Sequence, residues 1–319
     1  MAALSVRNVS IRYIMGDFKD IGFKEYVVRR LTGNYQVKEF WADRGITFSL
    51  NKGDMLGIIG MNGAGKSTLL KAISGIMVPT EGSVKVSGKI AALLELTAGF
   101  DKDLTVRENT YLRGALLGYT RAFMDEMYDE IIAFAELQDF QDRPFKQLSS
   151  GMKSRLAFSI ACLVNPDVLI LDEVLSVGDG AFRQKSGEKM REVLSRGVTG
   201  ILVSHSIAQV REMCNKILWL DHGQQIALGD DVQTLCDAYE EFLTTKALPK
   251  DEEEIARMAR VYRERLAIEA EKKREAALNN ARRLLLGDEE RAVQEAVDVL
   301  KRLSPELLNG YVREADSMA

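Results

Sequence analysis

Residues 55–75 read MLGIIGMNGAGKSTLLKAISG and carry the strongest signal of the fold. The apolar run at residues 55–59 favours a strand buried on both faces. The residues after the glycines predict a helix that continues through Ile73, where Gly75 can end it. Between strand and helix lies the pattern Gly-x-x-x-x-Gly-Lys-Ser. A strand, a glycine-rich loop and a helix in this order indicate a phosphate-binding loop.

The chemistry of this loop follows from its residue types. Glycines allow the backbone to approach phosphate oxygens closely, and the helix N-terminus adds a favourable dipole. We expect Lys66 to supply a positive charge to the β- and γ-phosphates and Ser67 to bind Mg²⁺. The candidate nucleotide-binding residues of the loop are Gly60, Met61, Asn62, Gly63, Ala64, Gly65, Lys66, Ser67 and Thr68.

A second motif, Val-Leu-Ile-Leu-Asp-Glu, ends at Asp172 and Glu173. A carboxylate at the end of a buried strand costs free energy unless a cation or hydrogen bonds compensate it. With a phosphate-binding loop in the same chain, we expect Asp172 to hold Mg²⁺ through water and Glu173 to accept a proton from the attacking water. The alternative is that both are solvated turn residues.

Two histidines follow strand-like segments. His205 comes directly after the apolar residues 199–204, and parallel strands place their carboxyl ends at one edge of a sheet. We therefore expect His205 to contact the γ-phosphate rather than to be an ordinary satisfied polar residue. His222, in Asp221-His222-Gly223, is typical of a hairpin turn and receives no role.

The rest of the first 246 residues predicts an α/β domain. Further strands are expected at residues 4–13, 45–50 and 167–171, and helices near 122–138, 151–164 and 180–195. Such alternation is typical of a mostly parallel sheet covered by helices.

Two segments stand outside this domain. Residues 14–44 predict an insertion with a short amphipathic helix, followed by the aromatic pair Phe40-Trp41. Basic residues interleaved with aromatics suit a membrane headgroup region or a membrane partner, although the aromatics could instead pack on the domain itself. Residues 247–319 predict a helical extension, a hairpin or small bundle, with Gly287 and Pro305 separating two shorter helices.

Composition limits the function. The 319 residues are 46% hydrophobic and 28% charged with a formal net charge of −4, so nothing attracts nucleic acid overall. Cys162, Cys214 and Cys236 are widely spaced, which favours buried thiols over disulfides or zinc ligands. No stretch approaches the ~18 consecutive apolar residues of a membrane helix, and the N-terminus lacks a signal-peptide core. We expect another polypeptide to provide any spanning part.

Residues 148–152, Leu-Ser-Ser-Gly-Met, resemble the LSGGQ signature of ATP-binding-cassette (ABC) ATPases, and Asp172 follows at the family's spacing. This resemblance implies a P-loop nucleotide-binding domain with a RecA-like core, an antiparallel β subdomain and a helical subdomain. It also implies ATP, Mg²⁺ and a head-to-tail homodimer. Ser149 and Gly151 would bind the partner's γ-phosphate, and Asp179 would belong to a crossing loop. Tyr13 is the expected platform for adenine; Trp41 is a poorer candidate.

The strings ALLELTAGFDKDLTVRENTYLRGALLG (residues 92–118) and LDEVLSVGDGAF (171–182) further resemble the ATPase subunits of polysaccharide exporters of the teichoic-acid, O-antigen and capsule type. The similarity covers about residues 1–240. It implies an ATP-hydrolysing subunit on the cytoplasmic face of a bacterial membrane. Its partner would be a permease dimer that handles a lipid-linked glycan. The sequence departs from the family's pattern in two places. Glu95 stands where the family has a glutamine that binds Mg²⁺, and in the signature Ser150 and Met152 stand where the commoner form has Gly and Gln.

Two other interpretations of the protein's function remain. A soluble cassette ATPase acting on nucleic acid or ribosomes would have two cassettes or a long coiled coil, which this sequence lacks. The chain could also be mainly a regulatory module acting through its tail. The tail is too short for the β-rich carbohydrate-binding domain of some O-antigen exporters.

Overall fold

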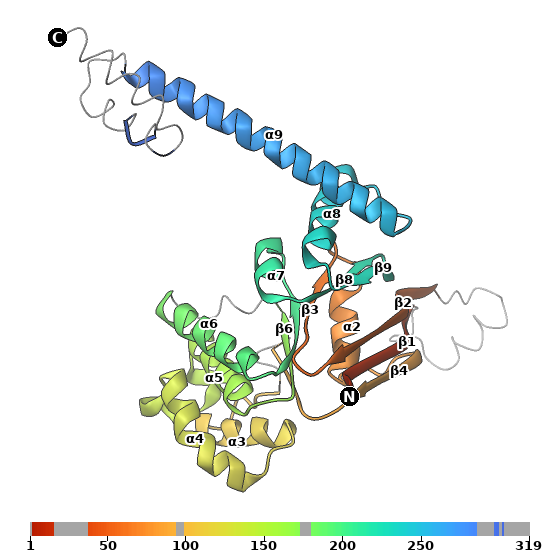
Figure 1. The fold of residues 1–319 in the computed structure, drawn as a ribbon. Coiled ribbons are helices and arrows are strands. Elements are labelled where there is room, and N and C mark those ends of the chain that lie inside the picture. Colours follow the sequence, from red (N-terminus) through yellow and green to blue (C-terminus); the bar gives the residue numbers. More distant parts are fainter. Residues whose placement is uncertain are drawn as a thin grey trace, which may run out of the picture. The chain divides into compact units, whose positions relative to one another are not determined.

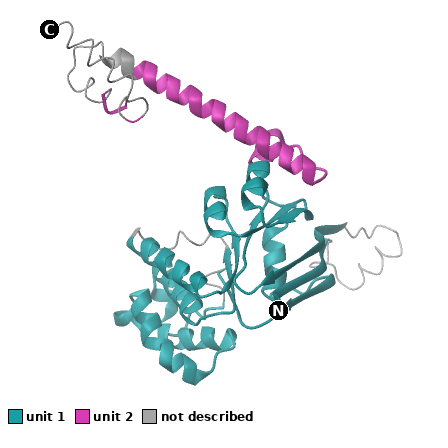
Figure 2. Ribbon diagram, viewed as in Figure 1, with its two compact units in different colours: residues 1–239 teal, residues 240–319 magenta. Residues whose placement is uncertain are grey.

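The computed structural model describes residues 2–15, 38–93, 99–172, 180–285, 297–299 and 302. The chain forms two compact units, Met1–Tyr239 and Glu240–Ala319 (Figure 2). The division lies inside a helix, a few residues before the expected boundary at residue 246. The expected α/β fold is confirmed.

A six-stranded sheet lies at the centre of the first unit (Figure 1). Its order is β5 (Ile90–Ala92), β6 (Val168–Asp172), β7 (Thr199–Val203), β3 (Met55–Ile59), β8 (Lys216–Asp221) and β9 (Gln224–Gly229). All neighbours are parallel except β8 and β9, which form a hairpin. All five residues of β3 are buried, as its apolar run predicts. The segments that follow β3, β6 and β7 therefore leave the same edge of the sheet.

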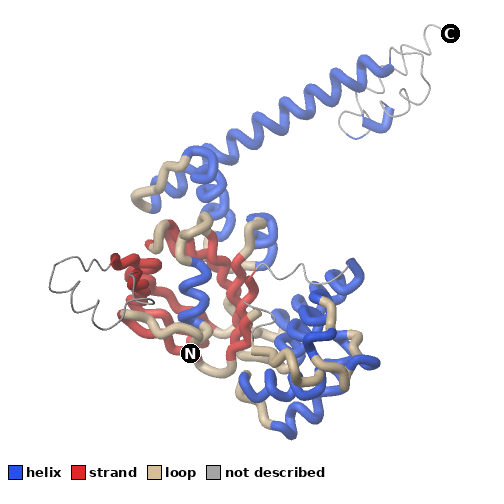
Figure 3. Tube along the Cα trace, turned by 180° about the vertical axis from the view of Figure 1, so that it is seen from behind, coloured by secondary structure: helices blue, strands red, loops and turns tan. Residues whose placement is uncertain are grey.

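The second sheet is antiparallel, with the order β2 (Lys38–Asn51), β1 (Ala2–Met15) and β4 (Glu81–Val86). Helix α2 (Lys66–Ile73) shares one apolar core with both sheets, to which Leu4, Leu50, Ile58 and Leu70 contribute. This shared core holds the start of α2 close to β2. Figure 3 shows the two groups of strands beside the helical part.

The bounds predicted for the insertion, residues 14–44, are wrong at both ends. Strand β1 runs to Met15 and β2 begins at Lys38, so only residues 16–37 separate them, and these lie outside the described residues. The aromatic pair Phe40-Trp41 belongs to β2, where Tyr13 faces Phe40 and Arg12 faces Trp41. Cross-strand pairing of aromatic and long side chains stabilises this end of the sheet. The expected amphipathic helix at residues 22–33 is also outside the described part.

The helical part of the first unit has its own core. Helices α3 (Val106–Leu116), α4 (Arg121–Ala135) and α5 (Ser150–Leu163) pack around buried side chains that include Ile131 and Leu156. The 3-10 turns η1 (Gln138–Phe140) and η2 (Phe145–Gln147) join α4 to α5. Helices α6 (Gly180–Ser195) and α7 (Ile207–Met213) follow β6 and β7.

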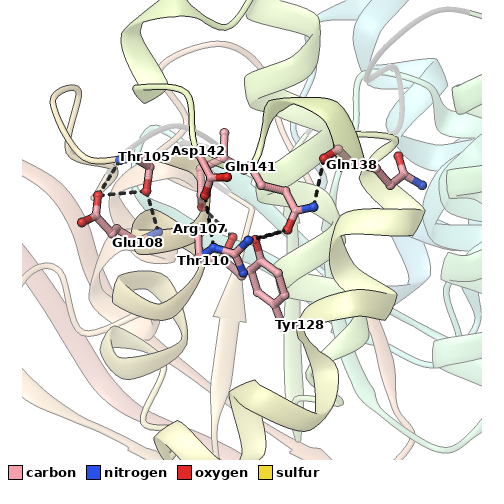
Figure 4. Close-up of polar contacts among 9 residues, drawn as sticks. Thr105, Arg107, Glu108, Thr110, Tyr128, Gln138, Gln141 and Asp142 are labelled. Atoms are coloured by element: carbon pink, nitrogen blue, oxygen red, sulfur yellow. Dashed lines mark hydrogen bonds and ion pairs between the residues drawn. The ribbon is translucent and has the colours of Figure 1, made fainter.

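Polar contacts fix the start of α3 in this helical part (Figure 4). Thr105 and Glu108 form a capping box, in which each side chain accepts a hydrogen bond from the other residue's backbone N–H. Arg107 Nη2 and the Tyr128 hydroxyl both donate to Gln141 Oε1, at 3.1 and 2.8 Å. These bonds join α3, α4 and the turn after η1.

The second unit is helical over residues 252–285, as expected for the extension. Helix α8 (Val232–Thr245) enters it, and α9 (Glu252–Leu285) is a single helix of 34 residues. Arg265 Nη2 donates to Thr244 Oγ1 at 3.2 Å and lies 2.9 Å from Glu241 Oε2, an ion pair whose angles do not make a hydrogen bond. The end of α8 and the start of α9 therefore form a hairpin. Gly287 and Pro305 lie outside the described residues. Among the helices that are described, none has the length and apolar character needed to cross a membrane.

Candidate nucleotide-binding site

The glycine-rich loop joins β3 to α2, as predicted. Gly65 is the N-cap of α2 with a φ of 103°, and a β-carbon there would lie 2.1 Å from Asp43 Oδ1. Only glycine has both the conformational freedom and the small size that this position requires. Lys66 Nζ donates to the carbonyl oxygens of Gly60 at 2.6 Å and Met61 at 2.9 Å. The ammonium group thus folds back over the loop.

A cavity of about 560 Å³ opens above the loop, within the range typical of small-molecule sites. Its lining residues come from β1, β2, the loop with the start of α2, and the end of β7: Tyr13, Phe40, Ala42, Asn62, Gly63, Ala64, Gly65, Lys66, Ser67, Thr68, Val203 and His205. Most of the candidate loop residues and two of the candidates outside the loop, Tyr13 and His205, thus surround one space. Gly60 and Met61 form the start of the loop below it and contact Lys66.

Among the described residues, two aromatic side chains line the cavity. Tyr13 is 37% exposed and its cross-strand partner Phe40 is 50% exposed, and both line the cavity. Trp41 is not among the lining residues; the guanidinium groups of Arg12 and Arg44 each lie 5.5 Å from its ring centroid. Sequence reasoning identified Tyr13 but missed Phe40, because it assigned Phe40 to an insertion.

The carboxyl end of the sheet brings the second and third motifs toward the loop. Asp172 ends β6 and pairs with Val203 of β7, which lines the cavity. His205, two residues further along, lines the cavity as well. The side chain of Asp172 and the residues Glu173, Asp179 and Glu95 are outside the described part, so their roles stay predictions.

Ser149 and Gly151 lie apart from this cavity. Ser149 is the N-cap of α5, and its hydroxyl accepts a hydrogen bond from Met152 N at 3.2 Å. Neither Ser149 nor Gly151 lines the cavity above the loop of the same chain.

The hairpin turn between β8 and β9 supports the loop from the side. His222 and Gly223 have φ values of 45° and 74°, the positive angles of a tight hairpin turn, so the turn predicted from sequence is confirmed. Gly223 N donates to Ala64 O at 3.1 Å, and Arg44 N donates to Gly223 O at 2.8 Å. The turn therefore connects the phosphate-binding loop to β2. Asp221 lies 2.7 Å from His222 Nδ1 and raises the pKa of this imidazole.

A buried carboxyl group lies beneath the loop, and sequence reasoning missed it. Asp43 of β2 has no exposed surface, and neither of its carboxylate oxygens has a hydrogen-bond partner among the residues that the structure describes. Burial raises the pKa of this carboxyl to about 8. Asp43 turns inward because β2 advances three residues, from Ile46 to Asp43, while β1 advances two, from Val9 to Ile11. This bulge breaks the alternation of inward and outward side chains that a sequence pattern relies on.

Comparison with known proteins agrees with the geometry. The profile of the ABC transporter family matches residues 44–176. An O-antigen export system ATP-binding protein RfbB of Klebsiella pneumoniae is 38% identical over 228 residues, which cover 71% of this chain and 93% of that protein. A protein of the same name from Myxococcus xanthus is 44% identical, with 70% and 52% covered. The teichoic acids export ATP-binding protein TagH of Bacillus anthracis is 42% identical, with 69% and 39% covered.

The chain spans about half the length of the first curated relatives it matches. Among solved structures, one described as the structure of the ATP binding subunit of an ABC transporter is 22% identical with a TM-score of 0.57, covering 81% of this chain and 99% of that one. A dimeric ATP-binding cassette bound to ADP and Pi is also 22% identical with a TM-score of 0.56, covering 71% and 98%. At this identity the structural likeness shows the fold alone. The resemblance to ATP-binding proteins of polysaccharide export is confirmed by the curated relatives, and the chain belongs to the ABC transporter family.

Proposed function

We propose that this chain is the ATP-hydrolysing subunit of an ABC exporter that drives a separate permease to move a lipid-linked polysaccharide across the cytoplasmic membrane. The observation that carries the ATPase part is the single cavity that joins Lys66 and Ser67 of the loop, His205 after β7, and the aromatic pair Tyr13 and Phe40. The similarity to O-antigen and teichoic acids export ATP-binding proteins supports the polysaccharide part.

The residues of the cavity suit a nucleoside triphosphate. The adenine base would stack on Tyr13 and Phe40, and the backbone N–H groups of residues 62–68 would bind the phosphates. Lys66 would then exchange its bonds to the carbonyl oxygens of Gly60 and Met61 for phosphate oxygens. His205 would hold the γ-phosphate, and Glu173 would orient the attacking water.

The donor set also fits Mg²⁺. The hydroxyl-bearing Ser67 lines the cavity at the start of α2, and Asp172 ends the strand two positions away in the sheet. Oxygen ligands of this kind are those that Mg²⁺ prefers in phosphate sites. When bound, the ion neutralises charge on the transferring phosphoryl group. Glu95 would complete the set in place of a glutamine.

The active unit is proposed to be a homodimer. Ser149 and Gly151 lie at the start of α5 and do not line the cavity of their own chain, which supports a phosphate contact to a nucleotide held by a second copy. Asp179 would lie on the loop that crosses between the copies. The remaining partner would be an integral-membrane permease dimer, which would place the chain on the cytoplasmic face of the membrane.

Steady-state hydrolysis of ATP by the full chain with Mg²⁺ tests the ATPase part. Lys66→Ala should weaken ATP binding and abolish turnover, whereas Lys71→Ala, a lysine on the same helix that does not line the cavity, should retain both. Equal activity of the two variants would refute the assignment. The export part predicts that cells lacking the chain accumulate finished glycan inside and lose it from the surface; normal surface glycan would contradict it.

A further inference from the structure

We propose that Asp43 is a proton-dependent positioning residue of the phosphate-binding loop: the site holds nucleotide while Asp43 keeps its proton, and loses affinity when the carboxyl ionises. This inference rests on the proposed nucleotide-binding function and adds a form of regulation to it.

The geometry places the carboxyl directly against the loop. Asp43 Oδ1 is the atom that a β-carbon on Gly65 would meet at 2.1 Å, and Asp43 Cγ would lie 3.0 Å away. On the other side, a β-carbon on Gly223 would lie 3.2 Å from Asp43 Cα. Asp43 is thus enclosed between the start of α2 and the β8–β9 turn. Its neighbour Ala42 lines the nucleotide cavity itself.

The charged groups around Asp43 are engaged elsewhere. Among the described residues, those on the elements packed against it are Arg7 and Arg12 of β1, Glu39 and Arg44 of β2, Lys66 and Lys71 of α2, and Asp221 and His222 of the turn. Arg7 Nε donates to Ser5 Oγ at 3.2 Å. Arg12 pairs with Glu39 at 2.8 Å, and Arg44 lies over the Trp41 ring. Lys66 donates to two loop carbonyl oxygens, and Asp221 contacts His222.

The pKa of the Asp43 carboxyl is therefore set by its burial. Burial is the cause of the raised pKa of Asp43, about 8, and no cation of the described residues offsets it. A neutral Asp43 leaves the positive field of the helix N-terminus and Lys66 available to phosphates. An ionised Asp43 in the same place opposes that field and attracts the Lys66 ammonium group, at short range and out of water. Nucleotide binding is therefore linked to retention of one proton.

Affinity for ADP at constant free Mg²⁺, measured from pH 7 to pH 9, tests this. With a pKa near 8, about nine-tenths of Asp43 is protonated at pH 7 and about one-tenth at pH 9, so wild-type Kd should rise roughly tenfold. Asp43→Asn, neutral at every pH, should show no comparable rise. A rise of equal size in this variant, or a flat wild-type profile, overturns the proposal.

Two control variants test whether another titrating group causes the pH dependence of the Kd. Glu39→Gln changes an exposed carboxylate on the same strand and should keep the wild-type pH profile. His222→Gln removes the other nearby group whose pKa is raised, and the profile must persist in it as well. A profile lost in His222→Gln but kept in Asp43→Asn would assign the linkage to the imidazole and refute the proposal.

A measurement on the wild type needs no variant to fold. Calorimetric titration with ADP at pH 8, in two buffers of different ionisation enthalpy, should report an uptake of about half a proton per ADP bound. Binding without proton uptake overturns this inference and leaves the proposed function intact. Absence of ADP binding at pH 7 overturns the proposed function, and the inference with it.

Discussion

Tyr13 and Phe40 are cross-strand partners of β1 and β2, and both side chains line the cavity above the phosphate-binding loop. Their pairing joins one residue that precedes the undescribed segment 16–37 with one that follows it. Two aromatic rings on one wall provide a larger apolar surface for a base than either ring alone.

Removing either ring should weaken nucleotide binding. Tyr13→Ala and Phe40→Ala should each raise the Kd for ATP by roughly three- to tenfold, since one aromatic contact contributes about 0.5–1.5 kcal/mol. Trp41→Phe is the control, because Trp41 contacts Arg12 and Arg44 and does not line the cavity. Calorimetry with a non-hydrolysable ATP analogue would measure the three affinities. An unchanged Kd in Phe40→Ala would exclude it from the base site.

A methyl group on Gly65 should destabilise the fold more than one on Gly63. Both glycines have positive φ, so each alanine variant suffers backbone strain of about 1–3 kcal/mol. At Gly65 the new β-carbon also meets Asp43 Oδ1 at 2.1 Å and Ala42 O at 2.8 Å, whereas at Gly63 nothing lies within 4 Å. Urea unfolding should show a larger loss in Gly65→Ala. Equal losses of stability in the two variants would mean that β2 moves away from the new methyl group at no cost in free energy.

Glu173→Gln should abolish turnover while an ATP-bound dimer accumulates. The amide cannot accept the proton of the attacking water, but it leaves the phosphate contacts of the loop intact. Size-exclusion chromatography with ATP would detect the dimer, and phosphate release would measure turnover. Steady-state hydrolysis at the wild-type rate would contradict the role of Glu173.

Stability should decrease as pH rises because of Asp43. Its pKa is about 8 in the folded chain against an ordinary value of 3.8, so between these values the folded state binds a proton that the unfolded state has lost. The free energy of unfolding therefore decreases from about pH 4 upward and levels off above about pH 8. Between pH 5 and pH 8 the wild type should lose on the order of 3 kcal/mol relative to Asp43→Asn. Denaturant unfolding at the two pH values checks this. An equal change of stability with pH in the two proteins would show that folding does not raise the pKa of Asp43.

Local signals explain which parts of the site the sequence could predict. Strand β3, the loop and α2 follow from one continuous stretch in which the apolar run, the glycines and the helix start are adjacent. The turn at His222 and Gly223 follows from two residues that tolerate positive φ. The carboxyl ends of parallel strands lie at one edge, so the approach of His205 to the loop was predictable from strand order.

The α/β fold, the phosphate-binding loop and the family could thus be predicted from the amino-acid sequence, because they depend on residues close together in the chain. The positions of Phe40 in the site and of Asp43, buried beneath Gly65, became evident from the three-dimensional structure. Both depend on the pairing of β1 with β2 and on a bulge that changes which side chains of β2 point inward. A bulge arises from contacts between strands, and no periodic pattern within one strand encodes it.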